Sequence, residues 1–246
     1  MVRTMNRVLA DHTIVGRAPR IVEIVGPAGA GKTALLQALR QRNESILVGA
    51  RPRVRRIGHI PFFVRNALSL LPILSRLYQN GRCFTRQEIV MLARLKGWHH
   101  VLARQASRSE GIIILDQGPV FILSWLSEFG PEGLKCQSTG TWWDNMIKQW
   151  AAALAVVIHL DAPDAVLMER INARSKSHAV KGKPEQEMHR FLARGRISME
   201  AVISRLAVDG GPRVLRFDTG QESPDQIAEE VLATLGLEPS EDEWSA

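Results

Sequence analysis

A loop at residues 26–33, with the sequence GPAGAGKT, has the residue types and spacing that bind the phosphates of a nucleoside triphosphate. Its glycines let consecutive backbone N–H groups turn inward around phosphate oxygens. The Lys32 ammonium group can reach the outer phosphates, and the Thr33 hydroxyl group offers an oxygen ligand to Mg²⁺. We therefore predict that a nucleoside triphosphate and Mg²⁺ bind at this loop.

A carboxylate ends a second segment of chemical interest, the apolar run at residues 111–116, GIIILD. Gly118 and Pro119 stop this run, so we expect Asp116 at the carboxyl tip of a buried strand. Ligands of parallel sheets bind at such tips. Asp116 would then hold Mg²⁺ or accept a proton from the attacking group. The alternative role is to cap the following turn.

Arginines dominate the loop after a predicted strand at residues 45–49: residues 50–56 read ARPRVRR and include no carboxylate. A hydroxyl acceptor usually requires a carboxylate base, whereas an acceptor that already carries a phosphate requires guanidinium groups. We therefore predict that Arg51 and Arg53 bind an anionic acceptor, with Arg94 from a later helix as a further ligand. The alternative is a basic loop that is merely solvated.

Two helices joined by a basic loop are predicted after residue 160. Residues 161–164 (DAPD) would cap the first helix, and Arg170 and Arg174 would share one of its faces because they are four positions apart. The joining loop at residues 175–183 is polar and basic. This layout is typical of a lid, expected at about residues 168–196, whose arginines neutralise charge on a transferring phosphoryl group. A plain surface loop is the alternative.

The elements that must position these groups alternate between strands and helices. Near-continuous apolar runs mark strands that are covered on both faces, so we expect an α/β fold with one parallel sheet. The predicted strands span residues 20–25, 45–49, 111–116, 155–160 and 213–217.

A long helical region is predicted from about residue 60 to residue 107. Thr85 and Glu88 form a capping box at the start of its second half. In its first half, residues 68–74 (LSLLPIL) are apolar. We expect a buried, kinked helix there, and the alternative is a helix on a membrane surface.

The composition indicates one domain. The chain has 246 residues, 45% of them apolar, and no linker divides it. We find no secretory signal at its start and no apolar run long enough to span a membrane. Two cysteines fit a reducing compartment, and neither has metal-site spacing. We therefore expect a cytoplasmic protein without a membrane partner.

The charge is unevenly distributed along the chain. The net charge is +7, yet nine acidic residues and no lysine or arginine follow Arg216, so the preceding part is more basic than the whole. A bound polyphosphate would suit this excess. A nucleic acid is the rival ligand, but the chain has no recognisable nucleic-acid-binding motif, so we expect no such partner.

These motifs resemble those of P-loop kinases of the nucleoside and nucleotide kinase group, most nearly the thymidylate-kinase-like branch. The resemblance covers residues 20–235 and implies a three-layer sandwich, in which a five-stranded parallel sheet has the order 2-3-1-4-5 and a helical lid covers the site. An acidic tail at residues 236–246 would complete this single domain of residues 1–246. The resemblance also implies that the loop at Asp218 lies near the adenine. The residues that it assigns to the donor nucleotide are Gly26, Gly29, Ala30, Gly31, Lys32, Thr33 and Ala34.

Two positions depart from that branch, and both lie on the acceptor side. Gln117 replaces an arginine that touches phosphate in thymidylate kinases. Residues 51–53 (RPR) replace an Arg-Glu-Pro sequence that helps to bind the monophosphate. We therefore predict that Gln117 and the arginine loop bind the acceptor, while the resemblance does not identify thymidylate as that acceptor.

The leading prediction is a kinase that transfers the γ-phosphoryl group of Mg-ATP to a small anionic acceptor, such as a nucleoside monophosphate. One alternative is a kinase of a neutral hydroxyl compound, with Asp116 as its base. Another is a nucleotide-dependent switch or a nucleic-acid-associated NTPase. A homodimer is left open. Lys32, Asp116, Arg170 and Arg174 are the predicted catalytic residues, and Thr33 and Asp116 are the predicted metal ligands.

Overall fold

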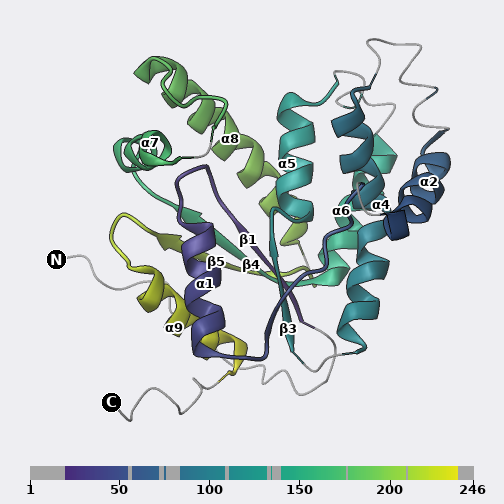
Figure 1. The fold of residues 1–246 in the computed structure, drawn as a ribbon, viewed down its shortest axis with the longest axis horizontal. Helices are drawn as coiled ribbons and strands as arrows, with labels where there is room; N and C mark the ends of the chain where they lie inside the picture. The colour runs from purple at the N-terminus through teal and green to yellow at the C-terminus, as the bar shows by residue number, and fades with distance from the viewer. Residues whose placement is uncertain are drawn as a thin grey trace.

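The computed structural model describes residues 20–54, 57–71, 75, 84–108, 111–131, 134, 140–175, 177–208 and 210–237. Strands and helices alternate through this part of the chain (Figure 1). In chain order, the elements are β1 (Ile21–Val25), α1 (Lys32–Arg42), β2 (Ile46–Val48), the 3-10 helix η1 (Ile57–His59), α2 (Ile60–Ser69), α4 (Arg86–Ala106), β3 (Ile112–Asp116), α5 (Pro119–Phe129), α6 (Gly140–Ala153), β4 (Leu154–Asp161), α7 (Asp164–Ala173), α8 (Glu185–Leu206), β5 (Arg213–Asp218) and α9 (Pro224–Leu235).

Some features named from the sequence lie outside the described residues. They are Arg55 and Arg56 of the arginine loop, the cysteines Cys83 and Cys136, and the acidic tail after residue 237. The predictions for these features stay predictions. The five predicted strands, in contrast, are confirmed to within one residue at each end.

The five strands of the described chain form one parallel sheet in the order β2-β3-β1-β4-β5, as the resemblance implied. β1 is central, because it pairs with β3 on one side and with β4 on the other. The register between β1 and β3 places Ile24 opposite Asp116. Since parallel strands end at the same edge, Asp116 lies next to the loop that follows β1.

Helices cover both faces of the sheet and create two apolar cores (Figure 1). α1, α7 and α9 enclose one core, to which Val22 and Ile24 of β1 contribute. α4, α5, α6 and α8 enclose the other, to which Ile21 and Val25 contribute. Alternate side chains of one strand therefore serve opposite faces, as expected for a strand buried on both sides. The predicted three-layer sandwich is confirmed.

α2 lies on the outer side of α4, away from the sheet (Figure 1). Leu70, just after α2, is buried, but Leu68 and Leu71 are mostly exposed. The prediction of a buried helix at residues 68–74 is therefore wrong for these two leucines, and residues 72–74 lie outside the described part. Nowhere in the described chain does a helix have the length and apolar character to cross a membrane.

α7 is shorter than predicted. It ends at Ala173, and Arg174 has an extended backbone with φ −66° and ψ 142°, so Arg170 and Arg174 do not share a helical face. The chain folds back after this point, where the Lys181 ammonium group contacts the Arg174 carbonyl oxygen. At the other end of α7, the N-cap residue is Pro163, which makes no side-chain cap hydrogen bond. The helix therefore starts within residues 161–164, as predicted, but no aspartate side chain caps it.

Candidate active site

The loop at residues 26–33 joins β1 to α1, as predicted. Gly26 has φ +148°, and a Cβ atom there would lie 2.1 Å from the Leu160 carbonyl oxygen, so only glycine fits. Lys32 Nζ donates hydrogen bonds of 2.8 Å to the Gly26 carbonyl oxygen and 2.7 Å to that of Pro27. The ammonium group is therefore folded back against its own loop. Because α1 begins at Lys32, the free N–H groups at its start are available to an anion.

Two charged side chains from other parts of the chain affect the pKa of Lys32. Burial lowers the pKa of Lys32 to about 8; the negative charge of Asp116 opposes this shift, and the positive charge of Arg174 adds to it. The register of β3 against β1 places Asp116 beside the loop, and Arg174 lines one cavity together with Gly29 and Gly31 of the loop.

Asp116 is the carboxylate at which two parts of the site meet. Its Oδ1 atom is buried and has no hydrogen-bond partner within the described residues. Its negative charge raises the pKa of both Lys32 and Arg51, although burial has the larger, opposite effect on each. Thr33, the second residue of α1, supplies a hydroxyl oxygen beside Lys32. A carboxylate and a hydroxyl oxygen are the hard ligands that suit Mg²⁺, so this pair fits the ion.

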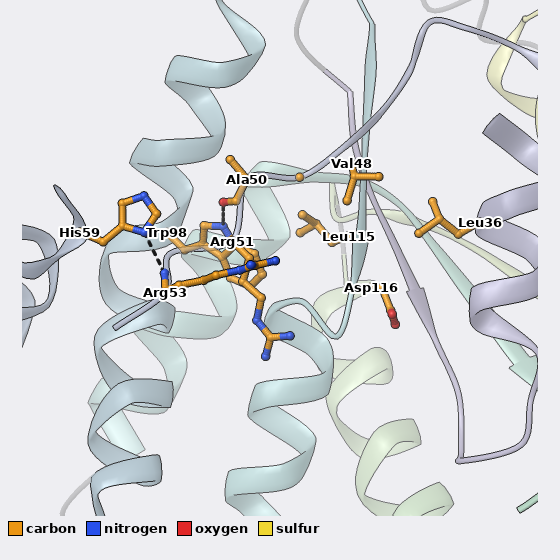
Figure 2. A pocket seen from close by; sticks show the side chains of 10 residues that line it. Leu36, Val48, Ala50, Arg51, Arg53, His59, Trp98, Leu115 and Asp116 are labelled. Carbon is orange, nitrogen blue, oxygen red and sulfur yellow. Dashed lines mark hydrogen bonds between the residues drawn. The ribbon is translucent and has the colours of Figure 1, made fainter. Parts of the chain in front are cut away.

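A cavity of about 730 Å³ lies beside Asp116. Figure 2 shows Arg51 and Arg53 on one side of it, with Leu36 and Asp116 on the other. It therefore combines two guanidinium groups with one carboxylate. The residues that line it are Leu36, Val48, Gly49, Ala50, Arg51, Arg53, His59, Trp98, Leu115 and Asp116.

Side chains from the helical region hold the arginine loop in place (Figure 2). Trp98 Nε1 donates a hydrogen bond of 2.8 Å to the Ala50 carbonyl oxygen, and the Arg53 N–H donates one of 2.9 Å to His59 Nδ1. Arg94 donates through Nε and Nη2 to the Pro52 carbonyl oxygen, at 3.2 and 3.0 Å. The predicted acceptor ligand Arg94 is therefore partly engaged with the loop itself. Trp98 and His59 had no distinguishing sequence signal for this role.

Positive charge accumulates at this cavity. Burial lowers the pKa of Arg51; Asp116 opposes this shift, and Arg53 adds to it. Burial and the charge of Arg51 together lower the pKa of Arg94 to about 10. Arg51 Nη1 donates to Gln117 Oε1 at 3.4 Å, and its buried Nε has no partner among the described residues. These neighbouring cations make the cavity suited to an anion.

Glu23 supports the end of β3 from within the sheet, and the sequence reasoning missed it. It is fully buried in β1, where Oε2 accepts a hydrogen bond of 2.8 Å from the Val120 N–H and Oε1 accepts one of 3.1 Å from the Phe121 N–H. Burial raises the pKa of Glu23 to about 8, against the effect of these donors. Glu23 thereby fixes the start of α5, just after Gln117, whose φ is +58°. An acid in the middle of the apolar run IVEIV was the available signal.

A smaller cavity of about 350 Å³ lies on the other side of the phosphate loop, among α1, α7 and α9. Arg170 and Arg174 both line it, together with Thr219. Arg170 Nη1 donates to Thr219 Oγ1 at 2.9 Å and to the Gly29 carbonyl oxygen at 3.3 Å, and Nη2 donates to the Thr219 carbonyl oxygen at 2.9 Å. Arg170 therefore ties the loop after β5 to the phosphate loop. The Asp218 carboxylate instead accepts hydrogen bonds within its own turn.

The segment between α7 and α8 approaches the phosphate loop. Burial lowers the pKa of His178 in this segment, and the charges of Arg174 and Lys32 add to the shift. The His178 ring packs edge-on against Phe191 of α8, with ring centroids 5.6 Å apart. Sequence reasoning gave His178 no role, because nothing in a polar loop indicates where it folds.

One arginine of α8 binds two carboxylates near the start of α7. Arg196 Nε donates to Asp161 Oδ2 at 2.8 Å, and Arg196 also forms an ion pair with Asp164. The two carboxylates predicted to cap α7 therefore bind the following helix instead. Together, α7, the joining segment and α8 have the helix, loop, helix layout that was predicted for residues 168–196.

The strand order, the phosphate loop between β1 and α1 and the carboxylate at the tip of β3 define a P-loop protein with the fold of nucleoside and nucleotide kinases. A family model described as AAA domain matches residues 21–196, and the chain belongs to this family. No curated protein matches the chain.

Solved structures show the same fold at low sequence identity. Thymidylate kinase from Candida albicans is 14% identical, with a TM-score of 0.55 over 89% of this chain and 92% of that one. Deoxyadenosine kinase from M. mycoides with bound dATP is also 14% identical, with a TM-score of 0.51 over 87% of this chain and 98% of that one. At such identities, the likeness establishes the fold.

Proposed function

We propose that the protein is a kinase that transfers the γ-phosphoryl group of Mg-ATP to a small anionic acceptor, such as a nucleoside monophosphate. The observation that carries this proposal is the position of Asp116, which lies opposite Ile24 beside the phosphate loop and lines one cavity with Arg51. A loop for donor phosphates and a cavity for an anion therefore meet at one carboxylate. Transfer between two bound ligands requires this kind of juxtaposition.

On the donor side, Lys32 and the backbone N–H groups of the loop bind the phosphates. The Lys32 ammonium group would exchange its two bonds to loop carbonyl oxygens for bonds to phosphate oxygens. Thr33 and Asp116 would hold Mg²⁺, which supplies positive charge to the phosphates when it is bound. The cavity of about 350 Å³ beside the loop after β5 would hold the adenosine part.

The two arginines near the lid take different roles. Arg170 holds the loop at Thr219 against the phosphate loop, so it shapes the nucleotide cavity. Arg174 lines the cavity beside the phosphate loop, and its charge lowers the pKa of Lys32. The contact that Arg174 makes with Lys181 is through its carbonyl oxygen, which leaves the guanidinium group for a ligand. Arg174 is therefore the better candidate for neutralising charge on the transferring group.

On the acceptor side, Arg51 and Arg53 bind the anionic group of the acceptor. Arg94 keeps the loop in position through Pro52 and adds to the positive potential. Gln117 holds the Arg51 guanidinium group near Asp116. Asp116 is the one carboxylate among the described residues that line the cavity of about 730 Å³ with Arg51 and Arg53, so an anionic ligand would supply further counter-charge.

One observation favours a second candidate, a kinase of a neutral hydroxyl compound. Asp116 Oδ1 is buried and without a hydrogen-bond partner among the described residues. A carboxylate oxygen in that state can accept the proton of an attacking hydroxyl group. The two candidates differ in what the arginine-lined cavity binds.

Acceptor-dependent ADP release over a panel of nucleoside monophosphates, nucleosides and sugars separates the candidates. We expect turnover with an anionic member of the panel. Arg51→Ala should raise the KM for that acceptor by roughly 10- to 100-fold, because a hydrogen bond to a charged group contributes about 1.5–3 kcal/mol. Arg213→Ala is the matched control, since Arg213 is exposed at the opposite end of the sheet. Turnover with uncharged alcohols alone would instead establish the second candidate.

A further inference from the structure

An apolar stripe runs along the outer face of η1 and α2 and ends at Leu71, just beyond α2. Its members are three or four positions apart, so they lie on one side of the helix. In the described chain, eight large apolar residues are exposed, and this short segment holds five of them. Such concentration marks an interaction surface, whereas single exposed apolar residues need no explanation. The stripe consists of Ile57, Ile60, Val64, Leu68 and Leu71, which are 84%, 46%, 51%, 58% and 54% exposed.

The stripe is not the face by which α2 joins the protein. That face holds Phe63, which is buried in the core formed with α4. The centroid of the Phe63 ring lies 6.0 Å from the guanidinium carbon of Arg94. α2 packs against α4 through it. The helix therefore has one apolar face in the core and a second apolar face in contact with solvent.

The sequence that contains the stripe is basic. In the sequence from residue 51 to residue 108, twelve arginines and lysines stand against one acidic residue, Glu88, and Glu88 is buried in the capping box of α4. Arg65 is exposed on α2 between Val64 and Leu68, and Arg86 is exposed at the start of α4. A partner for this face must therefore accept aliphatic side chains and carry negative charge.

This combination distinguishes among possible occupants. A second copy of the chain would place like charges opposite each other at a two-fold interface, which opposes association. A polynucleotide would accept the arginines but offers no layer that takes up a row of aliphatic side chains. An anionic lipid surface offers both, since the boundary of the acyl chains takes up apolar side chains and the headgroups attract arginines.

We propose that the apolar stripe docks the protein onto an anionic lipid surface, with α2 lying in the plane of the headgroups. The sequence left a helix on a membrane surface as the alternative to a buried helix at residues 68–74, and the exposed Leu68 and Leu71 favour that alternative. His59, between Ile57 and Ile60, lines the cavity of about 730 Å³. Docking would therefore bring this cavity next to the lipid headgroups. The proposal does not depend on the kinase reaction.

Flotation of the whole protein with lipid vesicles tests the proposal. Vesicles of phosphatidylcholine with about 30 mol% phosphatidylserine should retain about tenfold more protein than vesicles of pure phosphatidylcholine. Raising the salt concentration from about 0.1 M to about 0.5 M should reduce this retention, since headgroup attraction is screened. The double variant Val64→Ser/Leu68→Ser should lose about tenfold in vesicle binding.

A matched control comes from α8 and the turn that follows it, where Ile197 and Val208 are 71% and 62% exposed. Ile197→Ser/Val208→Ser removes a similar apolar area and should leave vesicle binding unchanged. Thermal unfolding followed by circular dichroism checks that both double variants fold. The proposal is overturned if the wild type floats with neither vesicle or if the stripe variant binds as well as the control. A stripe-dependent dimer in vesicle-free sedimentation would also overturn it in favour of a second copy.

Discussion

Replacing Glu23 tests how the sheet holds Asp116 at the site. Glu23 is fully buried, and its two carboxyl oxygens accept hydrogen bonds from the N–H groups of Val120 and Phe121, at 2.8 and 3.1 Å. In Glu23→Ala, both N–H groups lose their acceptor where water is excluded. An unsatisfied buried group costs about 1–3 kcal/mol, so the free energy of unfolding should fall by roughly 2–6 kcal/mol. That loss is a large part of the stability of a typical domain.

The variant Glu23→Gln separates charge from hydrogen bonding, because glutamine keeps one acceptor oxygen and does not ionise. Burial raises the pKa of Glu23 from its ordinary value of 4.5 to about 8 in the folded protein. The folded state therefore holds this proton more tightly than the unfolded state. Its contribution to stability is present below pH 4.5 and is lost as the pH rises from about 4.5 to about 8. The stability of the wild type relative to Glu23→Gln should fall over that range.

Urea unfolding followed by circular dichroism between pH 5 and pH 9 measures both effects. Glu229→Ala, at an exposed position of α9, serves as the control and should change the stability by less than about 0.5 kcal/mol. A loss of stability in Glu23→Ala that is no larger than that of this control would refute the supporting role of Glu23. A rise with pH in the stability of the wild type relative to Glu23→Gln would also refute it.

Three further predictions follow from the site. The kcat/KM for ATP should fall as the pH rises through about 8, because Lys32 loses its charge there. Arg174→Gln should move this fall to higher pH, since it removes a charge that lowers the pKa of Lys32. A shift of the fall to lower pH would contradict this prediction. Gly118→Ala should lower the free energy of unfolding by about 1–3 kcal/mol, because its Cβ atom would lie 2.7 Å from Glu23 Cδ, and an unchanged urea midpoint would contradict this. Arg170→Ala should raise the KM for ATP more than it lowers kcat, since Arg170 holds the loop after β5, and steady-state kinetics with the opposite pattern would refute that role.

The sheet and the phosphate loop could be predicted because their signals are local. The run at residues 111–116 is apolar at each position before Asp116 except the first, which indicates a strand covered on both faces. The spacing within residues 26–33 has a direct structural meaning, since Gly26 approaches the Leu160 carbonyl oxygen too closely for any side chain. The capping box at Thr85 is likewise a local signal, and it is confirmed.

The remaining features depend on contacts between distant segments. Leu68 has the same residue type as the buried Leu70, and only the position of α4 decides which of them is covered. Arg174 lies just beyond the end of α7, where its carbonyl oxygen contacts the Lys181 ammonium group, and helical spacing does not reveal such a contact. Glu23 finds its donors 97 residues away, at Val120. Such pairings follow from the tertiary fold, so the sequence alone did not assign them.

Phosphorus-31 NMR of the protein with Mg-ATP and a nucleoside monophosphate tests the kinase proposal most directly, because it follows the transferred group itself. We expect the resonances of the nucleoside diphosphate formed from the acceptor to grow in step with the loss of the ATP γ-phosphate resonance. Arg51→Ala should slow this transfer at low acceptor concentration, since Arg51 binds the acceptor's anionic group. Appearance of the lost γ-phosphate as inorganic phosphate alone, across the panel of anionic acceptors, would contradict transfer to a small anionic acceptor.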